Sequence, residues 1–297
     1  MGNPGLTESR ASSAVRLRPV ESADIEPLGR ICFEAFRSIA ERHGFPPDFP
    51  NAEVGTMVIG FFAGNPKMYG IAAELDGRVV GSNFLDERNA ISGVGPITID
   101  PAVHDAGIGR RLMEATLERS DTQGFAGCRL VQSAYHMRSL ALYVKLGFAP
   151  REELVALTGV PADPAADRFH VRLATDRDVA ACDALCAFVH GFARHEEVQQ
   201  AMTEGNVYVA ERDGALRAYT TGLGYLGHTV GESNDAIAAL LVKAPHMPSL
   251  GALVPMRNDR LFRWCLDHGM RAVHAMTLMS RGIYQEPQGP YLPSVTY

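Results

Sequence analysis

The sequence predicts an α/β protein with mixed sheets, built from two copies of one structural unit. Three observations support this class. The chain has 297 residues, more than the roughly 100 to 200 of a usual domain. Apolar residues alternate between strand and helix periods along the first half. Two short patterns of the first half recur, in the same order, in the second half.

The recurring patterns lie at the start and in the middle of each half. The stretch "RPVESADIEPLGRICF" from Arg18 matches "RLATDRDVAACDALCA" from Arg172, since each has an Asp six residues after the Arg and then apolar residues at helical intervals. The stretches "AAELDGRVVG" from Ala72 and "VAERDGALRA" from Val209 share Ala-Glu-x-Asp-Gly. A unit of about 140 residues therefore occurs twice.

A proline-containing stretch separates the copies. "TGVPADPAADR" has neither a helical nor a strand period, which is typical of a linker. We expect four segments: a disordered tail at 1–14, a first domain at 15–158, a linker at 159–168 and a second domain at 169–297.

The first elements of the first copy follow from period and turn residues. Residues 15–18 predict a short strand, and Ser22 predicts the N-cap of a helix over 23–41. "HGFPPDFPN" predicts a loop because prolines interrupt both periods. "YGIAAELDGRVVGSNFL" predicts a hairpin that turns at Asp76 and Gly77.

The remaining elements begin with an irregular strand. "ISGVGPITID" at 91–100 holds two glycines and a proline, which weaken a ladder and predict a bulge and a splayed strand. A helix at 107–119, a strand at 128–134, a helix that ends at Gly147 and a strand at 148–159 follow. The predicted order is β-α-β-β-β-α-β-α-β.

The start of the predicted helix at 107–119 carries a Gly-x-Gly pattern. Gly107 and Gly109 open a helix, where free backbone N–H groups bind anions and where Arg110 adds positive charge. The next residues exclude a P-loop, because Arg110 and Arg111 stand where Lys and Ser/Thr are needed. They also exclude a dinucleotide fingerprint, because Leu112 replaces the third glycine. Taken alone, the pattern leaves two alternatives open, a phosphate site and a plain tight turn.

Composition limits the class of partner. The net charge of −6 and the pI of about 5.9 argue against binding nucleic acid or an anionic membrane. The absence of a long apolar run and of a secretory signal leads us to expect a cytoplasmic protein. The five cysteines and ten histidines form no metal-ligand spacing, so we expect no metal.

Two motifs in sequence order make a resemblance specific. Gly-x-Gly-Arg-x-Leu-Met begins at Gly107, and Leu-Tyr-x-Lys-Leu-Gly-Phe occupies 142–148. Together they resemble the GCN5-related N-acetyltransferase (GNAT) superfamily over the whole first copy. "VGPITIDP" and "PYLPSVTY" further resemble a bacterial tandem-GNAT subgroup with a degenerate second domain. The resemblance implies two tandem GNAT-like domains, each with a twisted, mostly antiparallel sheet, flanking helices and a splayed central strand pair.

The resemblance also implies an acetyl-CoA site. The main chain of Ile97 and Ile99 would pair with the pantetheine arm, and His136 stands where the family has a helical Asn. His104 and His136 depart from the family pattern, which has Gln or Arg at the first position and Asn at the second, although a histidine can still donate a hydrogen bond. The diphosphate turn would consist of His104, Asp105, Ala106, Gly107, Ile108, Gly109 and Arg110.

The implied reaction is direct attack of a primary amine on acetyl-CoA in a ternary complex. Tyr143 would be the general acid that protonates the leaving thiolate. Glu87 and His43 are the weaker candidates for the base. The alternative is a non-catalytic acyl-CoA-binding regulatory protein, which the retained Tyr143 disfavours and the changes at His104 and His136 favour.

The second copy lacks both motifs. "LVKAPHMPSLGALVPMRNDRLFRW" has no Gly-x-Gly and predicts a helix starting near Asn258. We expect a domain without an acetyl-CoA site, which either supports the first domain or completes its acceptor cleft. Mycothiol synthase-like tandem GNATs, whose second copy is catalytic, give the contrary interpretation. The acceptor would be a small-molecule amine or a peptide or lysine amine, and a homodimer stays open.

Overall fold

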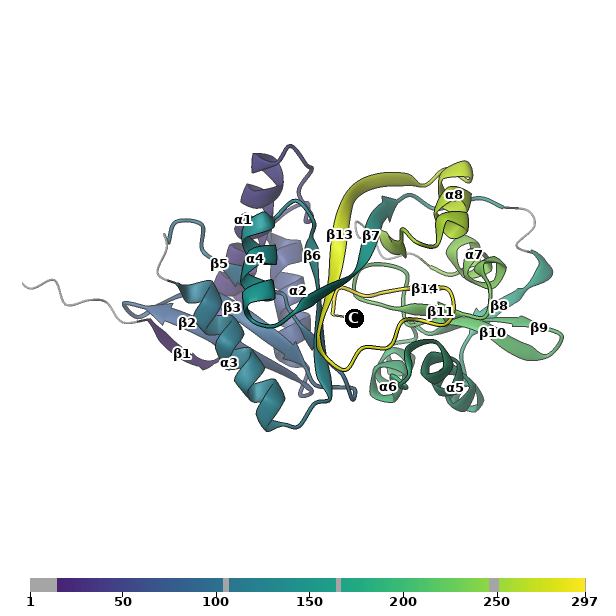
Figure 1. Ribbon diagram of the computed structural model, residues 1–297, viewed down its shortest axis with the longest axis horizontal. Helices are drawn as coiled ribbons and strands as arrows, with labels where there is room; N and C mark the ends of the chain where they lie inside the picture. The colour runs from purple at the N-terminus through teal and green to yellow at the C-terminus, as the bar shows by residue number, and fades with distance from the viewer. Residues whose placement is uncertain (1–14, 104–106, 164–166, 246–250, 297) are drawn as a thin grey trace, which may run out of the picture.

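The computed structural model describes residues 15–103, 107–163, 167–245 and 251–296. The first half of the chain forms these elements (Figure 1): β1 Arg16–Pro19, α1 Ile25–Arg42, α2 Ala52–Gly64, β2 Met68–Leu75, β3 Arg78–Asp86, β4 Ser92–Val94, β5 Thr98–Ile99, α3 Ile108–Thr122, β6 Gly127–Ser133, α4 Met137–Lys145 and β7 Ala149–Thr158. The predicted tail at 1–14 and part of the predicted linker lie outside the described residues.

The second half repeats much of this order. Its elements are β8 His170–Leu173, α5 Val179–His190, α6 His195–Thr203, β9 Tyr208–Arg212, β10 Ala215–Thr220, β11 Thr229–Gly231, α7 Asn234–Lys243, β12 Ala252–Pro255, α8 Asp259–Asp267, β13 Arg271–Gly282 and β14 Tyr291–Leu292. The predicted helix start near Asn258 is confirmed, because the Asn258 side chain accepts a hydrogen bond from the Leu261 N–H and caps α8.

Two mixed layers of sheet and helix confirm the predicted fold class. The larger sheet has nine strands in the order β1-β2-β3-β4-β6-β13-β7-β12, with β5 paired to β3 beside this path. The smaller sheet has the order β14-β11-β10-β9-β8. All pairings among the described strands are antiparallel except that of β4 with β6.

The two halves exchange strands at the centre of the molecule. Strand β13 of the second half lies between β6 and β7 of the first half, so that Leu278 pairs with Val131 on one side and Glu152 on the other. In turn, β7 lies between β13 and β12 of the second half. Figure 1 shows β13 and β7 running side by side between the halves. Each half therefore needs a strand of the other to satisfy its backbone hydrogen bonds.

An identical ion-pair cluster supports each half. In the first half, the Arg18 guanidinium donates to both carboxylate oxygens of Asp24, at 2.6 and 2.9 Å, and to Glu74 at 3.0 Å. This cluster ties β1 to the start of α1 and to β2. The second half repeats the cluster with Arg172, Asp178 and Glu211.

The hairpin turns repeat as well. Asp76 and Gly77 both have positive φ, as do Asp213 and Gly214 at the same place in the second half. Two consecutive positive φ values are typical of the type I′ turn that suits a two-residue hairpin. The hairpin predicted at Asp76 and Gly77 is confirmed.

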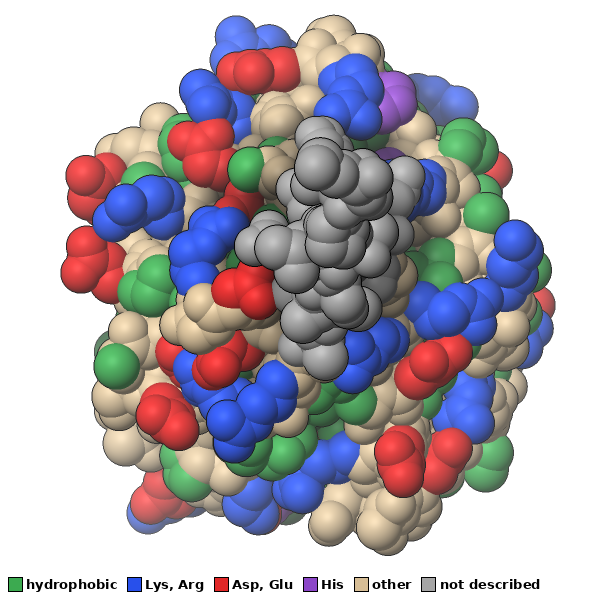
Figure 2. All heavy atoms as spheres, turned by 90° about the vertical axis from the view of Figure 1, so that its left-hand side faces the viewer, with side chains coloured by type: hydrophobic (Ala, Val, Ile, Leu, Met, Phe, Trp, Pro, Cys, Tyr) green, Lys and Arg blue, Asp and Glu red, His purple; other side chains and the backbone are tan. Residues whose placement is uncertain are grey.

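Helices cover both faces of the first-half sheet. Ala72 of β2 packs with α1 and α2, whereas the neighbouring Ile71 and Ala73 pack with α3. Alternate residues of one strand thus serve two separate cores. On the outer face of the first half, acidic and basic side chains are intermixed (Figure 2).

The predicted element order was wrong in lacking α2. The glycines of α2 obscure its helical pattern in the sequence. At the contact between the two helices, Gly55 of α2 and Gly29 of α1 leave no room for a side chain. A Cβ on Gly55 would lie 2.5 Å from the Gly29 carbonyl oxygen, and a Cβ on Gly29 would lie 2.3 Å from Thr56 Cα. The Asn51 side chain caps α2 by accepting from the Val54 N–H at 3.0 Å.

The predicted N-cap at Ser22 was also wrong. Residues Ser22–Asp24 form a short 3₁₀ turn before α1, and a capping box joins Glu21 to Asp24. Asp24 already binds Arg18, so the carboxylate that starts the helix also anchors it to β1.

Candidate active site

The predicted splay of the irregular strand is confirmed. β4 pairs with β6 only at Ser92 and Gly93, and a cis peptide bond joins Gly95 to Pro96 before β5 begins. Among the described strands, β5 pairs with β3 alone. The two sides of the sheet therefore diverge at this point.

The divergence leaves one edge of β5 facing away from its partner. The Asp100 N–H donates to the Val80 carbonyl on β3 at 2.8 Å. Because N–H groups alternate sides along a strand, that of Ile99 points to the opposite side, away from β3. Ile97 lies just before β5 and lines the cavity at the gap.

A cavity of about 160 Å³ opens at this gap. Main-chain segments 94–98 and 130–133 line it from the splayed strands, and α1 and α4 contribute further walls. Tyr225, Leu226, Met276 and Val295 close it from the second half. The cavity is therefore a joint product of both halves.

Tyr143 lies in this cavity. Its side chain projects from α4 and is buried, and burial raises the pKa of its phenol to about 12 against the opposing effect of a hydrogen bond with Ser139. The phenol is therefore protonated at neutral pH and can donate a proton within the cavity.

His136 lies beside Tyr143 at the start of α4. Its Nδ1 is 2.7 Å from the Ser139 hydroxyl, and both residues line the cavity. Burial, helped by the nearby His43, lowers the pKa of His136. The imidazole is therefore neutral at pH 7 and offers one donor and one acceptor.

The Gly-x-Gly turn meets β5. Gly107 has φ 65° and is the N-cap of α3, and a Cβ on Gly109 would lie 3.0 Å from Ile99 Cδ1. The first intrahelical bond runs from Arg111 N–H to Gly107 O, so the N–H groups of residues 108–110 precede it. Ile108 is buried, and the Arg110 guanidinium binds Glu114 at 3.0 Å; His104, Asp105 and Ala106 lie outside the described residues.

The structure does not bring the two suggested bases to the cavity lining. Glu87 forms a two-pronged ion pair with Arg119, at 2.6 and 2.9 Å, and that guanidinium lies 3.9 Å from the Tyr69 ring centre. The His43 Nδ1 is 2.9 Å from the Ile39 carbonyl oxygen, and its ring centre is 5.2 Å from that of Tyr135, a cavity residue.

Sequence reasoning missed two polar cavity residues. Asp48 belongs to the proline-rich loop, and its Oδ2 has no hydrogen-bond partner among the described residues. Burial raises the pKa of its carboxyl to about 6. The side-chain amide of Gln132 on β6 is likewise buried without a described partner. The signal for Asp48 was an acidic residue between Pro47 and Phe49 in the predicted proline-rich loop.

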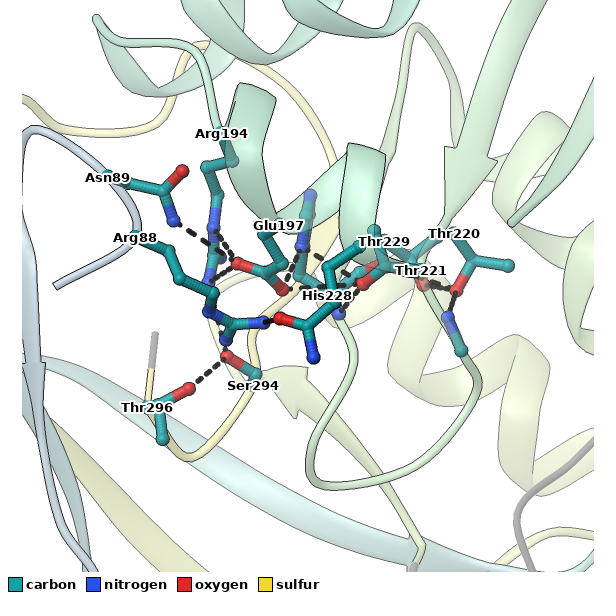
Figure 3. A network of polar contacts seen from close by, with 12 residues as sticks. Arg88, Asn89, Arg194, Glu197, Thr220, Thr221, His228, Thr229, Ser294 and Thr296 are labelled. Atoms are coloured by element: carbon teal, nitrogen blue, oxygen red, sulfur yellow. Dashed lines mark hydrogen bonds and ion pairs between the residues drawn. The ribbon is translucent and has the colours of Figure 1, made fainter. Parts of the chain in front are cut away.

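The described residues of the second half show no gap that matches the one beside β4. β14 occupies the place beside β11, where Tyr291 pairs with Val230. A buried polar network fills the neighbouring space (Figure 3). His228 lies at its centre, with Nδ1 2.7 Å from Glu197 and Nε2 2.7 Å from the Tyr219 hydroxyl.

Burial and the Arg194 guanidinium determine the protonation states of His228 and Glu197. Burial, helped by Arg194, lowers the pKa of His228 to about 4, so this imidazole is neutral at pH 7. Burial opposes the charge on Glu197, but the Arg194 guanidinium at 2.7 Å holds the pKa of that carboxyl well below its usual range. A neutral His228 can donate from Nδ1 to Glu197 and accept from Tyr219.

In the described part of the chain, no group of three or more His, Cys, Asp or Glu side chains is arranged to hold a metal ion. No helix within the same residues is long and apolar enough to cross a membrane.

The splayed strands, the glycine turn and the flanking helices define a mixed α/β fold with a gap in its larger sheet. The model of the Acetyltransferase (GNAT) family matches residues 32–148, which span α1 to the end of the Leu-Tyr-x-Lys-Leu-Gly-Phe motif. This part of the first half is therefore similar to the GNAT acetyltransferases, and the rest of the chain lies outside the match.

Solved structures share the fold over both halves. A putative acetyltransferase from Pyrococcus horikoshii has 17% identity and a TM-score of 0.70, covering 93% of this chain and 94% of its own. A GCN5-related N-acetyltransferase from Sphaerobacter thermophilus has 17% identity and a TM-score of 0.59, covering 92% of this chain and 96% of its own. No curated protein sequence matches the chain.

Proposed function

We propose that this protein is an N-acetyltransferase that moves the acetyl group of acetyl-CoA to a primary amine, and that its first half, 15–158, contains the site. The observation that carries the proposal is the protonated phenol of Tyr143 in the cavity where β4 and β5 diverge from β6. The second domain, 169–297, follows a linker at 159–168 and has no acetyl-CoA site of its own in this proposal.

Two free backbone surfaces suit the cosubstrate. The outward edge of β5 at Ile97 and Ile99 can bond the amides of a pantetheine arm. The N–H groups of Ile108, Gly109 and Arg110 precede the first intrahelical bond of α3 and suit a diphosphate. Gly107 belongs to the same turn, and the proposal assigns the rest of it to His104, Asp105 and Ala106. His136, neutral and cavity-lining, would donate to the cosubstrate.

The role of Tyr143 is to protonate the departing thiolate. In water a phenol is about 1.5 pKa units weaker as an acid than a thiol, which makes the transfer only mildly unfavourable. The desolvation that raises the phenol pKa in the cavity raises the pKa of a buried thiolate too, so the difference stays small. Because the phenol already lies in the cavity, no rearrangement is needed to present its proton.

The competing function is a non-catalytic acyl-CoA-binding regulator. A binder needs no acid in the cavity, so the buried Tyr143 supports the enzyme. The test measures thiol release from acetyl-CoA over a panel of small amines, a peptide N-terminus and lysine, with thermal shift by acetyl-CoA as the control. The proposal predicts a thermal shift and thiol release with at least one amine. A thermal shift with no thiol release across the panel would support the regulator.

A further inference from the structure

Asp48 is a buried carboxylate at the boundary between the halves. Its side chain is 9% exposed, and its Oδ2 has no hydrogen-bond partner among the described residues. It lines the cavity that also contains Tyr143. A buried carboxylate without a cation is costly, so its environment is one that a bound cation would complete.

No described group facing Asp48 supplies that cation. Cys32 faces it from α1, Tyr135 from the segment before α4, Tyr225 from the loop between β10 and β11, and His274 from β13. The nearest is His274, whose Nε2 is 3.8 Å from Asp48 Oδ1. Burial lowers the pKa of His274, and the other three groups are neutral at pH 7 because burial raises their pKa values.

Aromatic rings surround this carboxylate. Phe45 stacks on Tyr135 with ring centres 4.5 Å apart, and His274 meets both rings edge-on at 5.9 and 5.6 Å. Phe49 lines the cavity beside Asp48. Aromatic faces attract organic cations and pack against their apolar parts.

The second half closes the opposite wall. The Val295 N–H donates to the Tyr225 carbonyl oxygen at 2.7 Å, which holds the last described residues against the loop that carries Tyr225. A Cβ on Gly93 of β4 would lie 2.0 Å from the Thr296 carbonyl oxygen. Only glycine at 93 therefore allows the end of the second half to pack against the splayed strand of the first.

We propose that this composite pocket binds the acceptor as a compact organic ammonium ion, with Asp48 both holding its charge and removing its proton. The proposal rests on the proposed acetyltransferase function and adds to it the acceptor class and the base. A cavity of about 150 Å³ holds a benzene-sized molecule. The cavity of about 160 Å³ must also admit the thioester end of acetyl-CoA, so it suits a small amine with an apolar body rather than a folded protein segment.

Asp48 and Tyr143 together account for every proton that moves in the proposed reaction. Asp48 takes one proton from R–NH₃⁺, and the neutral amine nitrogen then forms a bond to the thioester carbonyl carbon. When the C–S bond breaks, the thiolate takes a proton from Tyr143. The nitrogen loses its second proton as the amide forms, which restores the Tyr143 phenol, and Asp48 returns its proton to water. The sum is amide, free thiol and one released proton.

The experiment compares wild type, Asp48→Asn and the matched control Asp76→Asn, which makes the same chemical change at an exposed turn where Asn tolerates positive φ. Phenethylamine, neutral 2-phenylethanol and anionic 3-phenylpropionate are titrated into each protein by calorimetry. Thiol release from acetyl-CoA is then measured with phenethylamine, butylamine and a lysine-containing peptide.

The expected pattern is specific to charge and to size. Wild type and Asp76→Asn bind phenethylamine at least about tenfold more tightly than the alcohol, the ratio that one buried charge interaction supplies. Asp48→Asn loses this preference and about 10²- to 10⁴-fold in kcat/KM for the amine, with its thermal shift by acetyl-CoA intact. The acid limb of the wild-type pH profile, with an apparent pKa near 6, disappears in Asp48→Asn.

Different results would contradict the proposal for Asp48 and the proposed acetyltransferase function. Equal turnover by Asp48→Asn overturns the assignment of the base, and turnover of the peptide alone overturns the compact-amine class. Both outcomes leave acetyl transfer standing. A protein that shows no thermal shift with acetyl-CoA and no thiol release with any amine instead removes the proposed function itself.

Discussion

The two halves share their scaffold and differ where the central strands meet. Arg18 and Arg172 form the same ion-pair cluster, each with one residue at the start of a helix and one on the second strand of its sheet. Yet the first half opens a cavity beside Tyr143, whereas the second half pairs β14 with β11 and buries Tyr219 in a polar network.

This difference separates residues that make the fold from residues that make a site. The ion pairs and hairpin turns recur because every copy of the sheet needs them. Among the described residues, the interrupted strand at 92–99 and the turn at Gly107 have no counterpart in the second half, and they are the features that interrupt regular backbone pairing. A site of this kind therefore depends on local departures from regular pairing.

The two halves should differ most in how turnover responds to loss of the hydroxyl of a buried tyrosine, Tyr143 in the first half and Tyr219 in the second. Tyr143→Phe should cut turnover by about 10²- to 10⁴-fold because the cavity loses its acid, with acetyl-CoA affinity nearly intact. Tyr219→Phe removes a hydroxyl bonded to His228 and should cost about 1–3 kcal/mol of stability while turnover is unchanged. Steady-state kinetics and urea unfolding on both variants decide this; equal turnover in the two variants contradicts it.

The polar network of the second half should be strongly stabilising as a unit. Glu197→Ala leaves the fully buried Arg194 without its carboxylate partner and should cost about 3–5 kcal/mol in unfolding free energy. Since the folded pKa of Glu197 is depressed, its contribution is present above its unfolded pKa and declines as the pH falls toward its folded pKa. Denaturant unfolding of the variant at several pH values measures both effects, and a loss below about 1 kcal/mol contradicts them.

The negative charge of Asp48 in the cavity should lower folding stability, whereas that of Glu197 raises it. Burial raises the pKa of Asp48 from 3.8 to about 6, so the folded state binds the proton more tightly and loses stability as the pH rises from about 4 to 6. The cost above pH 6 is at most about 3 kcal/mol. Asp48→Asn should therefore raise the thermal midpoint at pH 8 and leave it unchanged at pH 4. A variant that is less stable at pH 8 would show that Asp48 has a stabilising partner.

The smallest effect is expected from an exposed pair on α3. The Arg110 guanidinium and Glu114 are four residues apart and about half exposed, so Glu114→Gln should change stability by no more than about 0.5 kcal/mol. Because this change frees Arg110, acetyl-CoA affinity should stay equal or rise slightly. Isothermal titration with acetyl-CoA checks it, and a clear loss of affinity would place Glu114 itself in the binding site.

The sequence predicted those features whose cause is local. The turn at Asp76 and Gly77 needs positive φ, the splay follows from glycines and a proline inside one strand, and the cap at Asn258 uses its own side chain. Helix α2 was missed because its glycines serve a contact with α1, which a single helical pattern does not reveal.

The strand exchange and the composite pocket could not be predicted locally. The place of β13 between β6 and β7 depends on pairing across more than a hundred residues, and nothing in a strand's own alternation names its partner. Asp48 is buried at a boundary to which Tyr225 and His274 of the other half contribute, and its own loop does not indicate those neighbours. By contrast, a short motif was enough to suggest Tyr143, whose role as the acid stays a prediction.

The central claim is that the first half alone holds acetyl-CoA, and hydrogen exchange tests it most directly. Saturating acetyl-CoA should slow amide exchange at 97–99 and 107–111, where β5 and the start of α3 present free N–H groups. Exchange at 229–231 and 234–238, the strand and the helix start that hold the same places in the element order of the second half, should stay unchanged. Protection confined to these second-half segments, or absent from both sets, would contradict the account.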